Sequence, residues 1–153
     1  MKYIGIIAFI FTTSFYGCKH NLLETGINRE WSFDSIVYEK EDVMYCMNLN
    51  MLIFKDNGEV ELPSIFDDCS IFPKSEIIYG EWKIIKKNKK IFLKIESKNK
   101  AFNDTYRLIF KKQKITGMLL AILESEKMKI KMSCALIPKG NENYIDHLVS
   151  LTN

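Results

Sequence analysis

Apolar residues recur at every second position along most of the chain after residue 30. Between residues 127 and 136, lysines and a serine alternate with five apolar residues, namely Met128, Ile130, Met132, Cys134 and Leu136. A period of two is typical of a strand with one buried and one solvated face, whereas a helix has a period of about 3.6. The pattern therefore predicts a chain built mainly from amphipathic strands.

Turn residues divide the apolar runs into about eight predicted strands. Asp56-Asn57-Gly58 stands between two runs, and Asn-Gly favours a two-residue hairpin because both residues tolerate a positive φ. After Pro138-Lys139-Gly140, the segment 142–151 has the pattern of a short amphipathic helix. The predicted strands cover residues 31–38, 43–54, 60–62, 82–85, 91–95, 106–110, 115–123 and 127–136.

Short connections between consecutive strands predict an all-β fold, an antiparallel up-and-down barrel of about eight strands with a short C-terminal helix. A barrel of this size is either filled by its own side chains or holds one small ligand. Both alternatives apply to the same large residues, which are expected to face the interior: Trp31, Phe33, Trp82, Ile84, Leu93, Phe110, Met128, Ile130 and Met132.

The first residues have the order of a secretory signal peptide. Met1-Lys2 precedes an uncharged run, 3–16, that is shorter than the roughly 20 residues needed to span a membrane. The run ends in Phe15-Tyr16-Gly17-Cys18, which resembles the lipobox of bacterial lipoproteins, and of those of the Bacteroidota in particular. An ordinary secretory signal with a coincidental cysteine is the alternative, and it would leave a soluble protein.

The resemblance implies cleavage after residue 17 and attachment of fatty-acyl chains, such as palmitate, at Cys18. Residues 18–27 then form the lipidated N-terminus and tether, and residues 28–153 form the folded domain. Lys19-His20-Asn21, with no acid before Glu24, favours an outer-membrane lipoprotein that faces the periplasm. In this reading the protein belongs to the cell envelope and contacts its membrane through the lipid anchor.

The domain itself also resembles a known group, the lipocalin-like lipoproteins of the Bacteroidota. The matching features are an aromatic first strand from Trp31, a hairpin over 54–63 that ends in Leu62-Pro63, and Gly80-Glu81-Trp82 before an amphipathic hairpin. The resemblance implies a barrel that binds a small apolar ligand. The alternative is a scaffold or accessory subunit that binds an envelope protein through its charged outer surface.

Three cysteines remain after Cys18, in what would be an oxidising compartment. We predict a disulfide between Cys46 and Cys69, because Cys134 shares the apolar face of its strand and can stay a buried thiol. Three unpaired thiols are the alternative. No C-x-x-C spacing occurs, so no metal site is expected.

The net charge of the 153 residues is +3, too small to indicate nucleic-acid binding, and no nucleic-acid partner is expected. Its distribution is uneven, because residues 18–82 hold 5 basic and 13 acidic side chains and residues 83–153 hold 16 and 6, giving −8 and +10. We expect the lysines to form solvated outer faces of strands. A basic patch that attracts a polyanion or an anionic membrane surface is the alternative.

Catalytic motifs are missing from the sequence. His147 is the one histidine inside the predicted domain, and no serine or cysteine stands in a nucleophile-elbow motif. The acid pairs Glu41-Asp42 and Asp67-Asp68 are adjacent in sequence, so their side chains point apart. Since the chain also lacks a P-loop and a Gly-rich dinucleotide motif, we predict a non-catalytic protein without a cofactor.

Overall fold

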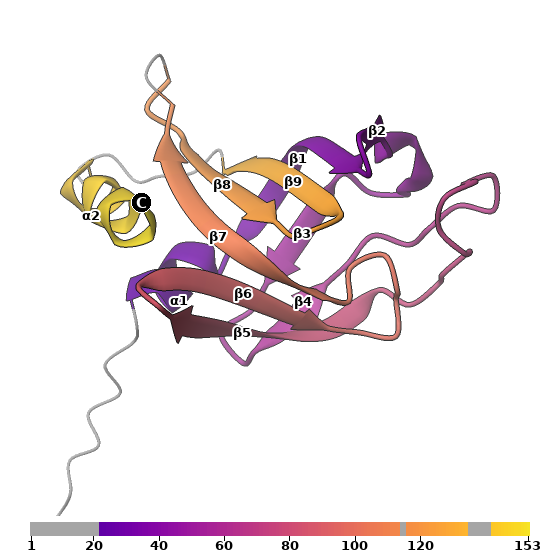
Figure 1. Cartoon of the computed structure of the whole chain (residues 1–153), viewed down its shortest axis with the longest axis horizontal. Helices are drawn as coiled ribbons and strands as arrows, with labels where there is room; N and C mark the ends of the chain where they lie inside the picture. The colour runs from indigo at the N-terminus through magenta and orange to yellow at the C-terminus, as the bar shows by residue number, and fades with distance from the viewer. Residues whose placement is uncertain (1–21, 114–115, 135–141) are drawn as a thin grey trace, which may run out of the picture.

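The computed structural model describes residues 22–113, 116–134 and 142–153 (Figure 1). The predicted signal peptide, residues 1–17, and the predicted lipidation site Cys18 lie outside the described residues. The same is true of residues 135–136, at the end of the last predicted strand.

Most of the described elements are strands. In chain order, the elements are α1 (Leu22–Ile27), β1 (Glu30–Tyr38), β2 (Glu41–Asp42), a 3-10 helix (Met44–Cys46), β3 (Met51–Phe54), β4 (Glu59–Glu61), β5 (Tyr79–Lys87), β6 (Lys90–Glu96), β7 (Asp104–Lys112), β8 (Leu119–Glu124), β9 (Met128–Cys134) and α2 (Glu142–Thr152).

Eight of the strands form a closed antiparallel barrel, which confirms the fold predicted from the sequence. From β3 to β9, each strand pairs with the next along the chain, and β1 pairs with both β3 and β9 to close the ring. The two-residue strand β2 extends the ladder at the end of β1. The short C-terminal helix α2 also matches the prediction.

The period-two pattern produces the core directly. In β9 the side chains of Met128, Ile130 and Met132 are buried, whereas Lys129 and Lys131 between them are exposed. Strands β6 and β7 alternate in the same way. The alternating pattern stabilises the fold mainly because the closed ring removes the apolar face of each strand from water.

The Asn-Gly hairpin forms, but its turn is longer than predicted. Only Gly58 has a positive φ, of 82°, and the backbone N–H of Lys55 donates to the carbonyl of Glu59 across the turn. The side chain of Asn57 instead accepts a hydrogen bond from the N–H of Glu59. Two-residue turns with positive φ at both positions occur instead at Glu39-Lys40 and at Asn88-Lys89. Neither of these pairs is Asn-Gly.

The prediction of one strand over 43–54 is wrong in its first part. The segment forms the 3-10 helix and an irregular connection before β3 begins at Met51. The carboxylate of Asp42 accepts a hydrogen bond from the N–H of Met44, and Cys46 is tied to Cys69, so the chain turns across the end of the barrel. Local hydrogen bonds and the cross-link replace strand pairing there.

The expected tether is wrong for its second half, because residues 22–27 form α1. Leu23 and Ile27, one helical turn apart, are buried against the barrel. The indole N–H of Trp31 donates to the carbonyl of Ile27 at 2.9 Å. The folded unit therefore includes residues 22–27, ahead of the predicted boundary at residue 28.

The barrel has two distinct ends, because antiparallel strands place successive turns at alternate ends. At the first end, which we call the helix end, lie α1, α2 and the turns 55–58 and 88–89. At the other, which we call the disulfide end, lie the turn 39–40 and the segments 43–50, 62–78 and 97–103. Figure 1 shows that the described chain both starts and finishes at the helix end.

Candidate functional site

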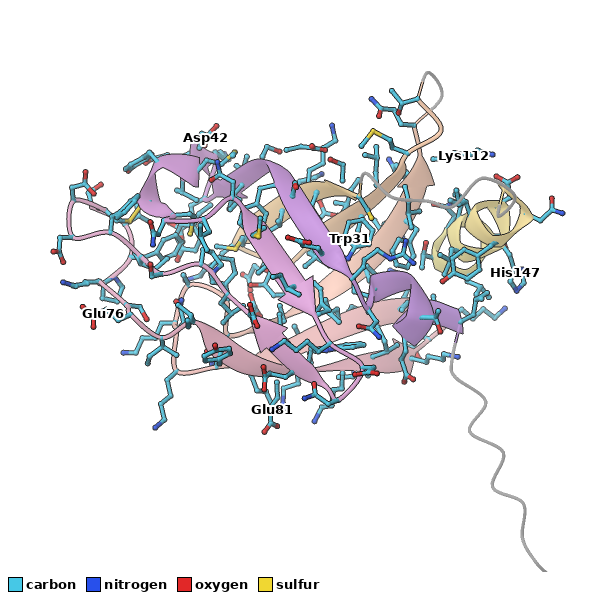
Figure 2. All side chains as sticks on the ribbon, turned by 180° about the vertical axis from the view of Figure 1, so that it is seen from behind. Trp31, Asp42, Glu76, Glu81, Lys112 and His147 are labelled. Carbon is cyan, nitrogen blue, oxygen red and sulfur yellow. A yellow bond between two sulfur atoms is a disulfide. The ribbon has the colours of Figure 1, made fainter. Side chains whose placement is uncertain are left out.

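The interior of the barrel is packed with the side chains predicted to face it. Five of the nine are completely buried, with a relative exposure of 0%: Trp31, Leu93, Phe110, Ile130 and Met132. Phe33, Trp82 and Met128 are also buried. Figure 2 shows Trp31 directed inward from β1, and its ring stacks on that of Phe110 with 6.1 Å between centroids. A ligand in the interior would have to displace these side chains.

Ile84 is the exception, since it is only half-buried against the core. The reason lies in the strand lengths. Strand β4 pairs only with 79–81 of β5, and the N–H of Trp82 donates to the carbonyl of Gly58 in the turn before β4, so beyond Trp82 no strand pairs with β5 on that side. The sequence alternation correctly indicates an inward direction for Ile84 but cannot show where the adjacent strand ends.

The core contains a buried hydroxyl, that of Tyr106, which donates to the carbonyl of Phe102 at 3.2 Å and lies 3.7 Å from the sulfur of Met128. Burial raises the pKa of Tyr106, with the nearby charge of Asp104 acting in the same direction. The hydroxyl is therefore a neutral structural donor and not a proton-transfer group near neutral pH.

On the outer face, three glutamates stand side by side on adjacent strands. Glu81 of β5 is in register with Glu59 of β4 and Glu96 of β6, and it points away from the barrel (Figure 2). Like charges directly opposite each other repel. Two of the three are compensated, since Lys55 lies 2.6 Å from Glu59, and Lys83 lies 3.4 Å from Glu96.

Lysines adjust the proton affinities in this row. Hydrogen bonds from Lys94 and Lys83 lower the pKa of Glu96, and hydrogen bonds to Glu59 and Glu61 raise the pKa of Lys55. Within the described residues, no group of three or more acids, histidines or cysteines is placed to hold a metal ion. The row is therefore a surface charge ladder across β4, β5 and β6.

The loops at the disulfide end are held by a covalent cross-link and by isolated β-bridges. The structure joins Cys46 to Cys69, the pair that the sequence favours, and leaves Cys134 as a buried free thiol. Beside the disulfide, the N–H of Phe66 donates to the carbonyl of Cys46, and Met47 bridges to Ile65. Ile65 bridges in turn to Ser75, so three stretches of loop are tied together.

Large apolar side chains remain exposed on these tied loops. Tyr45 and Leu49 are each 54% exposed and Phe66 is 42% exposed, although Met47 and Ile65 between them are buried. The hydroxyl of Tyr45 lies 3.4 Å from that of Ser70, across the disulfide-linked segments. We call the three side chains the apolar triad. A fixed group of exposed apolar residues is a feature of binding surfaces.

The segments that carry the apolar triad are acidic. Residues 39–49 and 62–78 hold six acids and two lysines, a net charge of −4, and the segment 97–103 at the same end adds Lys98 and Lys100, which brings the net charge of the three segments to −2. The only lysine of 62–78, Lys74, lies 3.1 Å from Asp67 and 3.5 Å from Glu76. Figure 2 shows Asp42 and Glu76 at this end of the molecule, opposite Lys112 and His147.

The triad is not predicted from the sequence, because the pattern places Tyr45 and Leu49 in the predicted strand 43–54 and Phe66 in no predicted element. One available signal is the composition of the two segments: Asn48 and Asn50 interrupt the first, and Pro63 and Pro73 bracket the second. Apolar residues between such turn formers are less able to pair in a sheet than their period suggests.

The residues considered for catalysis do not come together. His147 is exposed on α2 at the helix end, whereas Glu41, Asp42, Asp67 and Asp68 lie at the disulfide end.

Among the described residues, no helix is sufficiently long and apolar to cross a membrane. Comparison of the chain with family models, with curated proteins and with solved structures finds no match.

Proposed function

We propose that this protein is a lipid-anchored, non-catalytic scaffold of the bacterial cell envelope that binds a partner protein through its disulfide end. The observation that carries the proposal is the contrast between a filled interior and the exposed apolar triad, Tyr45, Leu49 and Phe66. A side-chain-filled barrel offers a rigid body instead of a cavity. Of the seven large apolar side chains that are exposed among the described residues, five lie in the segments 43–50 and 62–78, which the disulfide joins: Tyr45, Leu49, Phe66, Ile77 and Ile78.

The position of the proposed anchor fits this use of the disulfide end. Acyl chains on Cys18 would be four residues from Leu22, a maximum reach of about 14 Å for an extended chain. Because Leu22 lies at the helix end, that end would stay close to the membrane. The apolar triad would then face away from the bilayer, into the periplasm.

The chemistry of the surface defines the kind of partner. Tyr45 and Phe66 can fill apolar pockets, and the net charge of −4 on the segments 39–49 and 62–78 that carry them favours a partner with basic residues at the rim of its interface. The disulfide and the bridges from Met47 to Ile65 and from Ile65 to Ser75 hold the loops in place before binding. Less conformational entropy is therefore lost when the complex forms.

Two measurements test the anchor and the partner site separately. Fatty-acid labelling and sequencing of the mature N-terminus should show an acylated chain that begins at residue 18, and Cys18→Ser should abolish the label. For the partner site, mild crosslinking of the anchored protein in its own membranes should yield one defined adduct. That adduct should be lost in the double variant Tyr45→Ser, Phe66→Ser.

The matched control is Leu151→Ser, which removes an exposed apolar residue, 39% exposed, from the helix end. Its adduct should form at the wild-type level. An equal loss in the control and the double variant, with both proteins folded, would contradict a site at the disulfide end. If the protein instead gains thermal stability with an apolar compound and forms no adduct, the ligand-binding alternative is correct and the scaffold proposal is wrong.

A further inference from the structure

The tip of the β5–β6 hairpin carries four lysines in five residues: Lys86, Lys87, Lys89 and Lys90. All four are exposed, and the tight turn between them has positive φ at Asn88 (51°) and Lys89 (63°). Lys87 and Lys90 are direct cross-strand partners, an arrangement in which like charges repel. The hairpin therefore concentrates positive charge at a cost to its own stability.

These lysines are not neutralised in the way that other lysines of the same strands are. Lys83 of β5 and Lys94 of β6 lie farther from the turn than the tip lysines do, and both form ion pairs with Glu96. Within the described residues, no ion pair involves the four lysines at the tip. The charge of the tip is therefore available for a partner outside the chain.

The tip also extends beyond its neighbouring strands. The ladder between β5 and β6 continues to the pair Lys87–Lys90, whereas β4 pairs no farther than Glu81 and β7 no nearer to the tip than Phe92. The last residues thus form a two-stranded ribbon. This ribbon points from the helix end, and Figure 1 shows its turn at the same end as α1, where the described chain begins.

We propose that this lysine tip binds the anionic phospholipid headgroups of the membrane to which the protein is anchored. The inference rests on the proposed lipid anchor at Cys18, whose maximum reach of about 14 Å would hold the helix end within about one to two Debye lengths of the headgroups, each roughly 10 Å. Lysines near an anionic surface are attracted to it. Since acyl chains already retain the protein, the tip sets its orientation and keeps the disulfide end directed outward.

The test is amine-reactive labelling of the full acylated chain, quantified for each lysine by mass spectrometry. The protein is compared in vesicles that contain phosphatidylglycerol and in vesicles of phosphatidylcholine alone. Labelling of the four tip lysines should fall about fivefold in the anionic vesicles, the factor that corresponds to the attraction of one lysine to an anionic surface. High salt should restore the labelling.

Lys40 and Lys100 are internal controls, because both are exposed at the disulfide end. Their labelling should be the same in the two kinds of vesicle. Equal labelling of the tip lysines in both vesicles, with the protein retained by both, would overturn the inference and leave the anchor intact. Failure of phosphatidylcholine vesicles to retain the protein would instead overturn the anchor. Protection by added duplex DNA and not by anionic vesicles would identify a nucleic-acid site and overturn the membrane assignment.

Discussion

At the residue scale, single positions are fixed by close contacts that composition does not show. Gly80 is the clearest case, since a Cβ atom there would lie 2.9 Å from the carbonyl oxygen of Glu96 and 3.0 Å from the Cβ of Ser97. The first of these atoms belongs to the backbone of the next strand, so it cannot move without disturbing the ladder. The Gly-Glu-Trp motif thus includes a glycine required by strand packing.

We expect Gly80→Ala to destabilise the protein by about 1–3 kcal/mol through this clash, measured as the free energy of unfolding in urea. Gly26→Ala is the matched control. Its added Cβ would meet side-chain atoms and no backbone, namely the methyl groups of Leu148 at 2.8 and 3.0 Å and the ring of Phe110 at 3.4 Å, and alanine is the better helix former in α1. A loss in the control as large as that of Gly80→Ala would contradict the backbone explanation.

The buried hydroxyl of Tyr106 gives a pH prediction. Burial raises its folded-state pKa above the unfolded value of about 10, so the folded state holds a proton that the unfolded state releases. Stability should therefore be unaffected by this group below about pH 10 and should fall as the pH rises above it. Urea unfolding at about pH 8 and about pH 11 would measure the loss.

Tyr106→Phe separates this effect from that of other basic groups. The variant should be less stable by about 1 kcal/mol near neutral pH, because the hydrogen bond to Phe102 is lost. Above pH 10 it should lose less stability than the wild type does. An identical alkaline decline in both proteins would show that Tyr106 does not titrate on unfolding.

At the element scale, much of the fold follows from the sequence. The alternation in β6, β7 and β9 gives the right strands because each strand has one face in a single core and one in water. The helix α1 is missed because six residues are too few for a clear period, although Leu23 and Ile27 have the spacing of one buried face. The segment 43–50 is missed because its conformation is set by the distant Cys69.

The disulfide should fix this segment and add global stability. The Cys46→Ser, Cys69→Ser variant should lose about 3 kcal/mol, the value expected for closing a loop with a sequence separation of 23. Hydrogen exchange should rise at the amides of Asn48 and Phe66, which bond across the tied loops, and not in β7. Cys134→Ala, which removes a buried thiol from β9, serves as the control and should leave those two amides protected.

At the scale of the whole molecule, the two ends of the barrel differ in charge and in covalent constraint. The helix end presents the lysine tip and the start of the described chain, whereas the disulfide end presents the apolar triad in an acidic setting. This polarity is not visible in the sequence, because it depends on which turns the closed ring places together. The sequence shows only that one half of the chain is acidic and the other basic.

The polarity predicts the outcome of moving the lipid anchor that is proposed at Cys18. Because α2 also ends at the helix end, a lipid anchor attached after Asn153, in a chain with Cys18→Ser, should present the same surface outward. The crosslinked adduct of the disulfide end should therefore form at close to the wild-type level. An adduct reduced to the level of the Tyr45→Ser, Phe66→Ser variant would show that the direction of the barrel is not set by the end that carries the lipid.

The return of the chain to its starting end has a practical consequence for anyone who labels this protein. Under the anchor proposed at Cys18, a fluorescent or affinity reporter fused behind α2 would lie between the barrel and the bilayer, and it would compete with the lysine tip for space. A short epitope inserted between Glu39 and Lys40, in the exposed two-residue turn that joins β1 to β2, would project from the opposite side, where antibodies and crosslinkers have access.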